Sequence, residues 1–155
     1  MLGPVDLTKP GVNTFRLAGL PKAYFVLGFD VTGKSPTGTS IYDSRPISTV
    51  VRLTLTDEQS RVIIDEVGPL DKWTWSGSPH HAEAFVYRQG EGRDVPLPDG
   101  SVGFEALGVK PDEGFGSAFS PRPEGVYSLQ IEVVNEDPRA SAFVVKAMGK
   151  TGGWE

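Results

Sequence analysis

The fold class of this chain can be read from residues 125–134, whose sequence is Gly-Val-Tyr-Ser-Leu-Gln-Ile-Glu-Val-Val. From Tyr127 to Val133, the apolar residues at odd positions alternate with polar residues at even positions. Because successive side chains of a strand point to opposite faces, this pattern predicts a strand with one buried and one solvated face. The same period of two recurs at residues 25–31 and 47–55. Repeated alternation of this kind favours packed antiparallel sheets.

We expect about eight strands, separated by segments rich in Gly and Pro. They cover residues 13–17, 22–32, 47–56, 61–67, 72–76, 82–88, 125–135 and 139–148, and a short ninth covers 102–107. No segment longer than about ten residues has a helical period free of Gly and Pro, so little helix is expected. The sequence predicts an all-β, two-layer antiparallel β-sandwich, immunoglobulin-like or jelly-roll, that forms one domain over residues 1–155.

Size and composition narrow the possible functions. A chain of 155 residues is long enough to bury a core without covalent crosslinks. It has no cysteine, so disulfides, thiolate nucleophiles and zinc-thiolate or iron–sulfur sites do not arise. The net charge is −5, and the basic residues are scattered, which argues against a nucleic-acid partner. We expect no cofactor.

No apolar run is long enough to span a bilayer, and no secretion signal precedes Asp6. A chain whose signal peptide had been removed would look the same, so an exported protein fits the sequence as well as a cytoplasmic one.

Two short polar turns and three long loops connect the predicted strands. Residues 57–60 and 135–138 each lie between apolar runs and indicate hairpins, the second joining the last two strands. Residues 33–46, 89–100 and 110–125 are too long and irregular for simple turns. Long loops on a rigid sandwich often carry binding sites.

Phe115 and Phe119 are candidate binding residues in the third loop, because they lie among glycines and serines. Aromatic side chains on such a backbone could contact a partner. The competing interpretation is that one or both fold back and cover an open end of the core.

Trp73 and Trp75 are a second candidate site. If residues 72–76 form a strand, both indoles project from one face, about 7 Å apart, a spacing that suits successive sugar rings. Alternatively, the two rings fill the core, where aromatic side chains contribute most.

The residues from Gly28 to Ser35 match the pattern G-x-x-x-x-G-K-S of phosphate-binding loops. That loop requires a helix that begins at the Lys-Ser pair, whereas Pro36 and Gly38 follow here. Because Phe29 and Val31 continue the alternation of a strand, we predict a strand and no nucleotide site.

His80 and His81 could suggest a metal or a catalytic base. Adjacent residues of an extended chain point to opposite faces, so both cannot reach one ion without a turn, and we predict surface loop histidines. Acidic turns at 98–100, 112–114 and 136–137 could together bind calcium, but none has the spacing of a dedicated calcium loop. We therefore predict solvated turns and no metal.

Tyr127 follows a turn at the head of a core strand. This placement resembles the tyrosine corner of Greek-key sandwiches, in which the hydroxyl bonds to backbone of a nearby loop. We predict that Tyr127 is buried and that its hydroxyl has such a partner.

Several segments together resemble a group of small uncharacterised bacterial exported proteins and lipoproteins with β-sandwich folds. They are residues 7–11, 24–29, 45–53, 125–129 and 152–154. Some members of this group are regarded as immunity proteins of secreted antibacterial effectors. The lipoprotein cysteine of that group is missing from this chain. The resemblance implies a periplasmic or lipid-anchored location in the bacterial envelope and a protein-binding role.

Three hypotheses for function follow. The first is a non-enzymatic protein-interaction module of the cell envelope, such as an immunity-type inhibitor of a toxin. The second is a carbohydrate-binding domain that uses Trp73 and Trp75. The third is a hydrolase with a site among the loop carboxylates and histidines, since perturbed carboxylates cannot be identified from a sequence.

Overall fold

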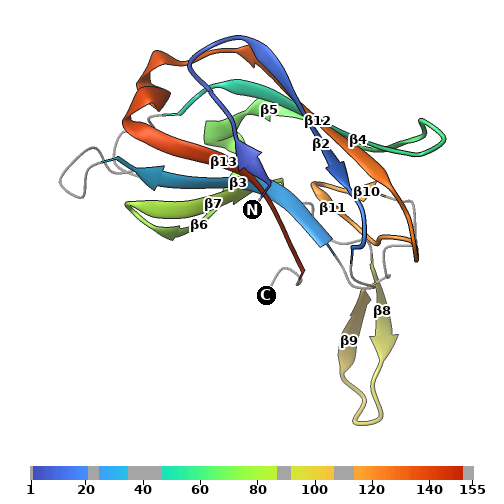
Figure 1. Ribbon diagram of the computed structural model, residues 1–155. Coiled ribbons are helices and arrows are strands. Elements are labelled where there is room, and N and C mark those ends of the chain that lie inside the picture. Colours follow the sequence, from blue (N-terminus) through green and yellow to red (C-terminus); the bar gives the residue numbers. More distant parts are fainter. Residues whose placement is uncertain (1, 21–24, 35–46, 87–91, 107–113, 152–155) are drawn as a thin grey trace.

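The computed structural model describes residues 2–20, 25–34, 47–86, 92–106 and 114–151, and of residues 92–95, 103–106 and 114–115 it describes the backbone alone. Two antiparallel sheets pack face to face as a β-sandwich (Figure 1), which confirms the predicted fold class. Helical structure among the described residues is confined to two 3-10 turns, η1 (Leu70–Lys72) and η2 (Pro138–Ala142). None of these residues forms a helix long and apolar enough to cross a membrane.

Sheet A has seven strands. They are β1 (Gly3–Pro4), β3 (Phe25–Gly33), β6 (Thr74–Ser78), β7 (His81–Phe85), β10 (Gly114–Phe115), β11 (Ala118–Phe119) and β13 (Phe143–Thr151). Strand β3 lies at the centre: β13 pairs with one edge along its whole length. The other edge pairs with β11 near Phe25 and with β7 near Val31.

Sheet B has four strands in the order β2-β12-β4-β5. Their bounds are β2 (Gly11–Leu17), β4 (Val50–Asp57), β5 (Val62–Pro69) and β12 (Tyr127–Asn135). A separate two-stranded hairpin is formed by β8 (Gly92–Pro96) and β9 (Val102–Ala106). The described strands therefore number thirteen, several of them very short, against the eight or nine expected from alternation.

The core lies between the two sheets and consists of the alternating apolar residues. On β12 the inward residues from Tyr127 to Val133 are at most 3% exposed, and on β3 those from Phe25 to Val31 are at most 7% exposed. Burying each of these large side chains contributes about 1.5–3 kcal/mol. On β12 the period of two thus also identified the buried face, whereas on β3 every residue from Phe25 to Val31 is buried and both faces are covered.

The turn at 135–138 does not form the predicted hairpin. Strand β12 pairs with β2 and β4 in sheet B, whereas β13 pairs with β1 and β3 in sheet A. Between them, η2 carries the chain from one sheet to the other, and Asp137 caps this turn by accepting a hydrogen bond from the backbone N–H of Arg139 (3.0 Å). In contrast, the turn at 57–60 joins the paired strands β4 and β5 as expected.

The segment that matches the phosphate-loop pattern is a strand, as predicted. Gly28 to Gly33 belong to β3, and Ser35 lies outside the described residues. A Cβ at Gly28 would come within 2.2 Å of the carbonyl oxygen of Ala84, so glycine is required there for the close approach of β7.

Tyr127 forms the predicted corner. It is 1% exposed, and its hydroxyl accepts a hydrogen bond from the backbone N–H of Arg122 (2.9 Å). A Cβ at Gly125 would lie 2.9 Å from the tyrosine ring, so the loop passes close over the ring at a residue without a side chain.

Replacing Tyr127 with Phe should lower the free energy of unfolding by about 1 kcal/mol, because the N–H of Arg122 loses a buried acceptor while the ring still packs. Urea unfolding of the two proteins measures this difference. A loss above about 3 kcal/mol would show that the ring itself had moved, since that is the scale of a core truncation.

Candidate functional site

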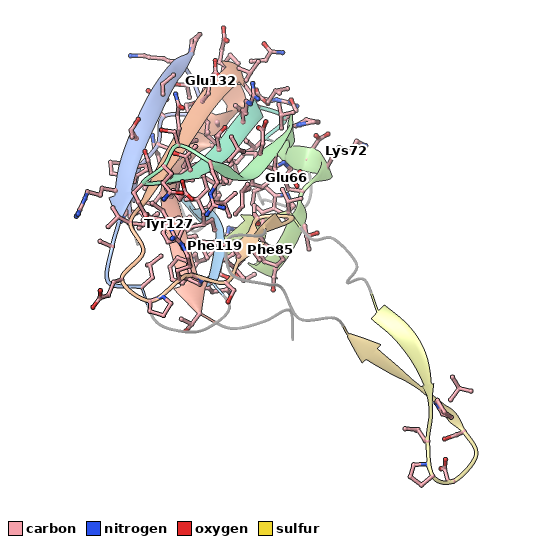
Figure 2. The ribbon with its side chains drawn as sticks, turned by 90° about the vertical axis from the view of Figure 1, so that its right-hand side faces the viewer. Glu66, Lys72, Phe85, Phe119, Tyr127 and Glu132 are labelled. Atoms are coloured by element: carbon pink, nitrogen blue, oxygen red, sulfur yellow. The ribbon has the colours of Figure 1, made fainter. Side chains whose placement is uncertain are left out.

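Phe119, predicted as a binding residue, is a core residue. It is fully buried in β11 and its ring makes edge-on contacts with Phe25 (centroid distance 5.9 Å) and Tyr127 (5.0 Å). Figure 2 shows Phe119 beside Tyr127 within the sandwich. The placement of Phe119 therefore corresponds to the competing interpretation, in which the segment folds back over the core. Phe115 lies in β10 opposite Ala118, and its side chain is not among those described.

Trp73 belongs to the hydrophobic core, and Trp75 is partly buried and packs against it. Trp73 follows η1, is 9% exposed and packs its ring against Phe29 (5.4 Å between centroids). Trp75 lies in β6 opposite the buried Ala84, and its indole N–H donates a hydrogen bond to the carbonyl of Leu70 (2.8 Å). A platform for sugar rings requires two aromatic rings with exposed faces. The ring of Trp73 packs in the core, so it does not offer such a face.

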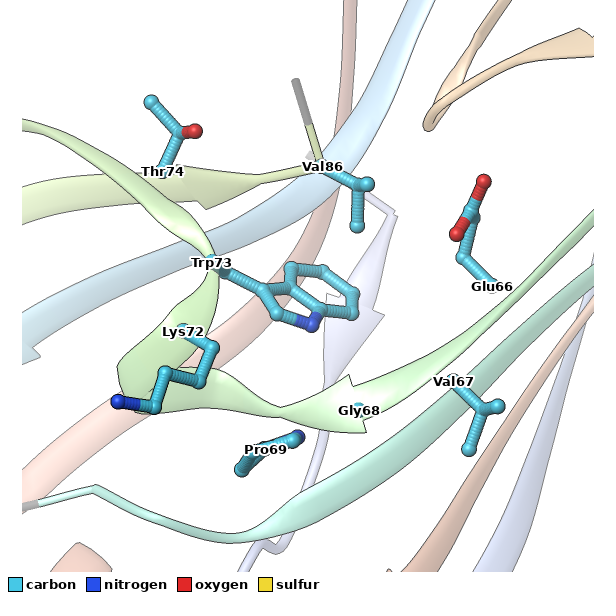
Figure 3. A pocket seen from close by; sticks show the side chains of 8 residues that line it. All are labelled: Glu66, Val67, Gly68, Pro69, Lys72, Trp73, Thr74 and Val86. Atoms are coloured by element: carbon cyan, nitrogen blue, oxygen red, sulfur yellow. The ribbon is translucent and has the colours of Figure 1, made fainter. Parts of the chain in front are cut away.

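A surface pocket nevertheless opens beside Trp73 (Figure 3). It has a volume of about 250 Å³ and lies where the edge strand β5 of sheet B meets η1 and the start of β6. Its walls come from eight residues, namely Glu66, Val67, Gly68, Pro69, Lys72, Trp73, Thr74 and Val86. We call this the Trp73 pocket.

The β8–β9 hairpin stands clear of the sandwich. Figures 1 and 2 view the molecule from directions 90° apart, and in both the hairpin points away from the two sheets. At its tip, Leu97 is 42% exposed and Val102 is 70% exposed, and the intervening residues are also exposed. Apolar side chains at the end of a projecting element are a feature of interaction surfaces.

The tip of this hairpin has a defined conformation. The N–H of Leu97 donates to the carbonyl of Ser101 (2.9 Å), and the N–H of Gly100 donates to the carbonyl of Leu97 (3.0 Å). The carboxylate of Asp99 accepts from the N–H of Ser101 (2.9 Å) and from its hydroxyl, and these bonds lower the pKa of Asp99. Gly100 has a φ of +84°, which glycine adopts without strain. Pro96 and Pro98 further restrict the backbone.

The hairpin is acidic. Residues 92–106 contain one basic residue, Arg93, and three acidic residues, Asp94, Asp99 and Glu105. A positive potential around the binding surface of a partner would therefore favour its association with this tip.

His81 has an acidic partner that the sequence did not reveal. It begins β7, and its Nε2 lies 2.6 Å from Oδ1 of Asp30 on the neighbouring strand β3. An aspartate can orient a histidine for base catalysis, but a nucleophile must then reach the ring. The hydroxyl of Ser78 bonds to the backbone of His81 and not to its ring (3.1 and 3.2 Å).

The described acidic turns do not converge on one ion. Asp99 lies at the hairpin tip, whereas Asp137 lies at the η2 crossing at the far end of the sandwich (Figure 1). Asp112 and Glu113 lie outside the described residues. Within the described ranges, no three histidine, aspartate or glutamate side chains gather as metal ligands would.

The hairpin was not predicted from the sequence, because the prolines and glycines of residues 89–100 indicated a loop. The short apolar run at 102–107 was the one signal, and it corresponds to β9. No family model, curated protein or solved structure matches this chain.

Proposed function

We propose that this chain is a non-enzymatic protein-binding module whose binding element is the β8–β9 hairpin. The observation that supports it is the apolar, acidic tip that projects from the sandwich, with Leu97 and Val102 exposed on a backbone restrained by hydrogen bonds. A restrained tip loses little conformational entropy on binding, which favours affinity.

The shape and charge of the tip define its partner. A narrow projecting element buries its end only in a concave surface, and its carboxylates favour a basic rim. We therefore propose a protein partner with an apolar cleft edged by Lys and Arg. The resemblance to immunity-type proteins extends the proposal to a secreted toxin whose cleft is blocked in the bacterial envelope, and this extension depends on the resemblance alone.

Photo-crosslinking tests the proposal directly. A photoreactive amino acid at position 97 should crosslink, in cells of the native host, to a protein whose crosslinked peptide lines a basic cleft. The same group at position 144 is the matched control, because Val144 is 41% exposed on the outer face of sheet A, close to the 42% of Leu97. The proposal would be contradicted if positions 97 and 144 gave the same crosslinked proteins in equal yield, or if position 97 gave no crosslinked protein.

Replacing Leu97 with Asp should weaken binding to the crosslinked partner at least about 30-fold, equivalent to about 2 kcal/mol, because a charge would enter an apolar cleft. The fold should not change, since Leu97 is exposed. Calorimetric titration measures the affinity. Val144→Asp is the control and should bind like the unchanged protein.

A further inference from the structure

We infer that the Trp73 pocket is a binding site for a small carboxylate with an apolar body. It is separate from the β8–β9 hairpin, so the inference does not depend on the proposed function. Its basis is an indole N–H that has no acceptor among the described residues and that opens into a pocket with partly apolar walls, lined by one cationic and one anionic residue.

The indole N–H of Trp73 is the donor. Trp73 is 9% exposed, and no residue of the described chain accepts a hydrogen bond from its Nε1, although the N–H of Trp75 is bonded to Leu70. Figure 3 shows Nε1 on the side of the ring that faces Gly68 and Pro69. The indole nitrogen itself is open to the pocket, and the N–H of a largely buried Trp usually has a hydrogen-bond partner. A ligand oxygen in the pocket would supply it.

The pocket offers space for more than water. Its volume is about 250 Å³, whereas an apolar cavity of about 150 Å³ is large enough for benzene. Val86 and Pro69 line the pocket with apolar surface, and Gly68 leaves its part of the wall without a side chain, whereas the side chain of Val67 points away from the indole. These features suit an aromatic or branched aliphatic group.

The charge of Lys72 favours a ligand with an anionic head group. Lys72 lies at the rim on the η1 side, and its flexible four-carbon stem can bring the ammonium to an anion. Glu66 also lines the pocket, on the side of the indole away from Lys72 (Figure 3). A carboxylate would therefore lie between Trp73 and Lys72, with its apolar body toward Val86.

Three probes with the same ring and different head groups test this assignment. Phenylacetate, phenylacetamide and 2-phenylethylamine are an anion, a neutral acceptor and a cation. Each is titrated to about 10 mM against the ¹⁵N-labelled protein, a range that detects millimolar affinities. The indole resonance of Trp73, assigned with Trp73→Phe, should shift with phenylacetate, shift less with the amide and not move with the amine.

Two glycine variants locate the site. Gly68→Val fills the pocket wall, and a Cβ there would meet only Nε1 of Trp73, at 3.8 Å, so the strand tolerates it. Gly11→Val is the matched control, because Gly11 lies on the other edge strand of sheet B and a Cβ there meets nothing within 4 Å. Gly68→Val should weaken phenylacetate binding at least about tenfold, whereas Gly11→Val should not change it.

Charge variants complete the test. Lys72→Gln should weaken phenylacetate binding about fivefold or more, the effect of losing a charge-assisted hydrogen bond. Lys146→Gln, on the exposed face of β13, should leave it unchanged. Stronger binding of the amine, an equal effect of the two glycine variants, or no shift of the Trp73 resonance with any probe would each overturn the inference.

Discussion

Replacing Phe119 with Ala should lower the free energy of unfolding by about 3–5 kcal/mol, the range for truncating a buried phenylalanine. The side chain is fully buried, and its ring joins Phe25 of the same sheet to Tyr127 of the opposite sheet. Truncation removes both ring contacts and leaves a cavity between the layers. Chemical denaturation with a tryptophan signal measures the loss.

The matched control is Val144→Ala, which removes apolar atoms from an exposed position of sheet A and should cost less than about 0.5 kcal/mol. If Phe119→Ala cost under about 1 kcal/mol, Phe119 would be a surface residue and the binding-loop hypothesis for this segment would regain support.

Replacing Asp137 with Ala should cost about 3 kcal/mol at neutral pH, because several charge-assisted hydrogen bonds are lost at once. Asp137 is 6% exposed. Its carboxylate accepts from the backbone N–H and hydroxyl of Ser48 (3.0 Å each) and from the guanidinium of Arg139 (2.9 Å to Nη2). These contacts join the η2 crossing to the segment that enters β4, so the loss would loosen one end of the sandwich.

The same site predicts a pH dependence. The side-chain hydrogen bond from Arg139 and the donors of Ser48 hold the pKa of Asp137 well below its ordinary value. Because the folded-state pKa is depressed, the contribution is complete above the unfolded pKa of about 3.9 and is lost as the pH falls through the folded value. The stability difference between the unchanged protein and Asp137→Asn should be constant from pH 5 to 8 and shrink below about pH 4. A difference that persisted undiminished at pH 2 would contradict this assignment.

Strand content was predictable because alternation depends on local sequence. Strands β3, β4, β5 and β12 were found within a few residues of their ends, and the buried faces of β4 and β12 followed from the same pattern. Which strands pair with one another was not predictable in the same way. The turn at 135–138 has the composition of a hairpin, but the five residues of η2 carry the chain across to the other sheet. That crossing depends on pairing with β1 and β3, which lie far away in sequence.

The candidate sites were less predictable than the fold. Two-residue strands such as β11 show no alternation, so Phe119 was placed in a loop although it lies in the core. The ring contact of Trp73 depends on Phe29, and the partner of His81 is Asp30, 51 residues away. Such contacts arise only when β7 pairs with β3 on one side and with β6 on the other. The spacing of residues within one segment therefore could not predict them.

In our proposal, binding resides in the β8–β9 hairpin and stability in the sandwich. Excising the hairpin, by replacing residues 92–106 with a short Gly-Ser linker, tests this division most directly. We predict that the variant unfolds at nearly the same denaturant concentration as the unchanged protein and no longer retains the partner crosslinked from position 97. Retention of that partner by the folded variant would contradict the claim.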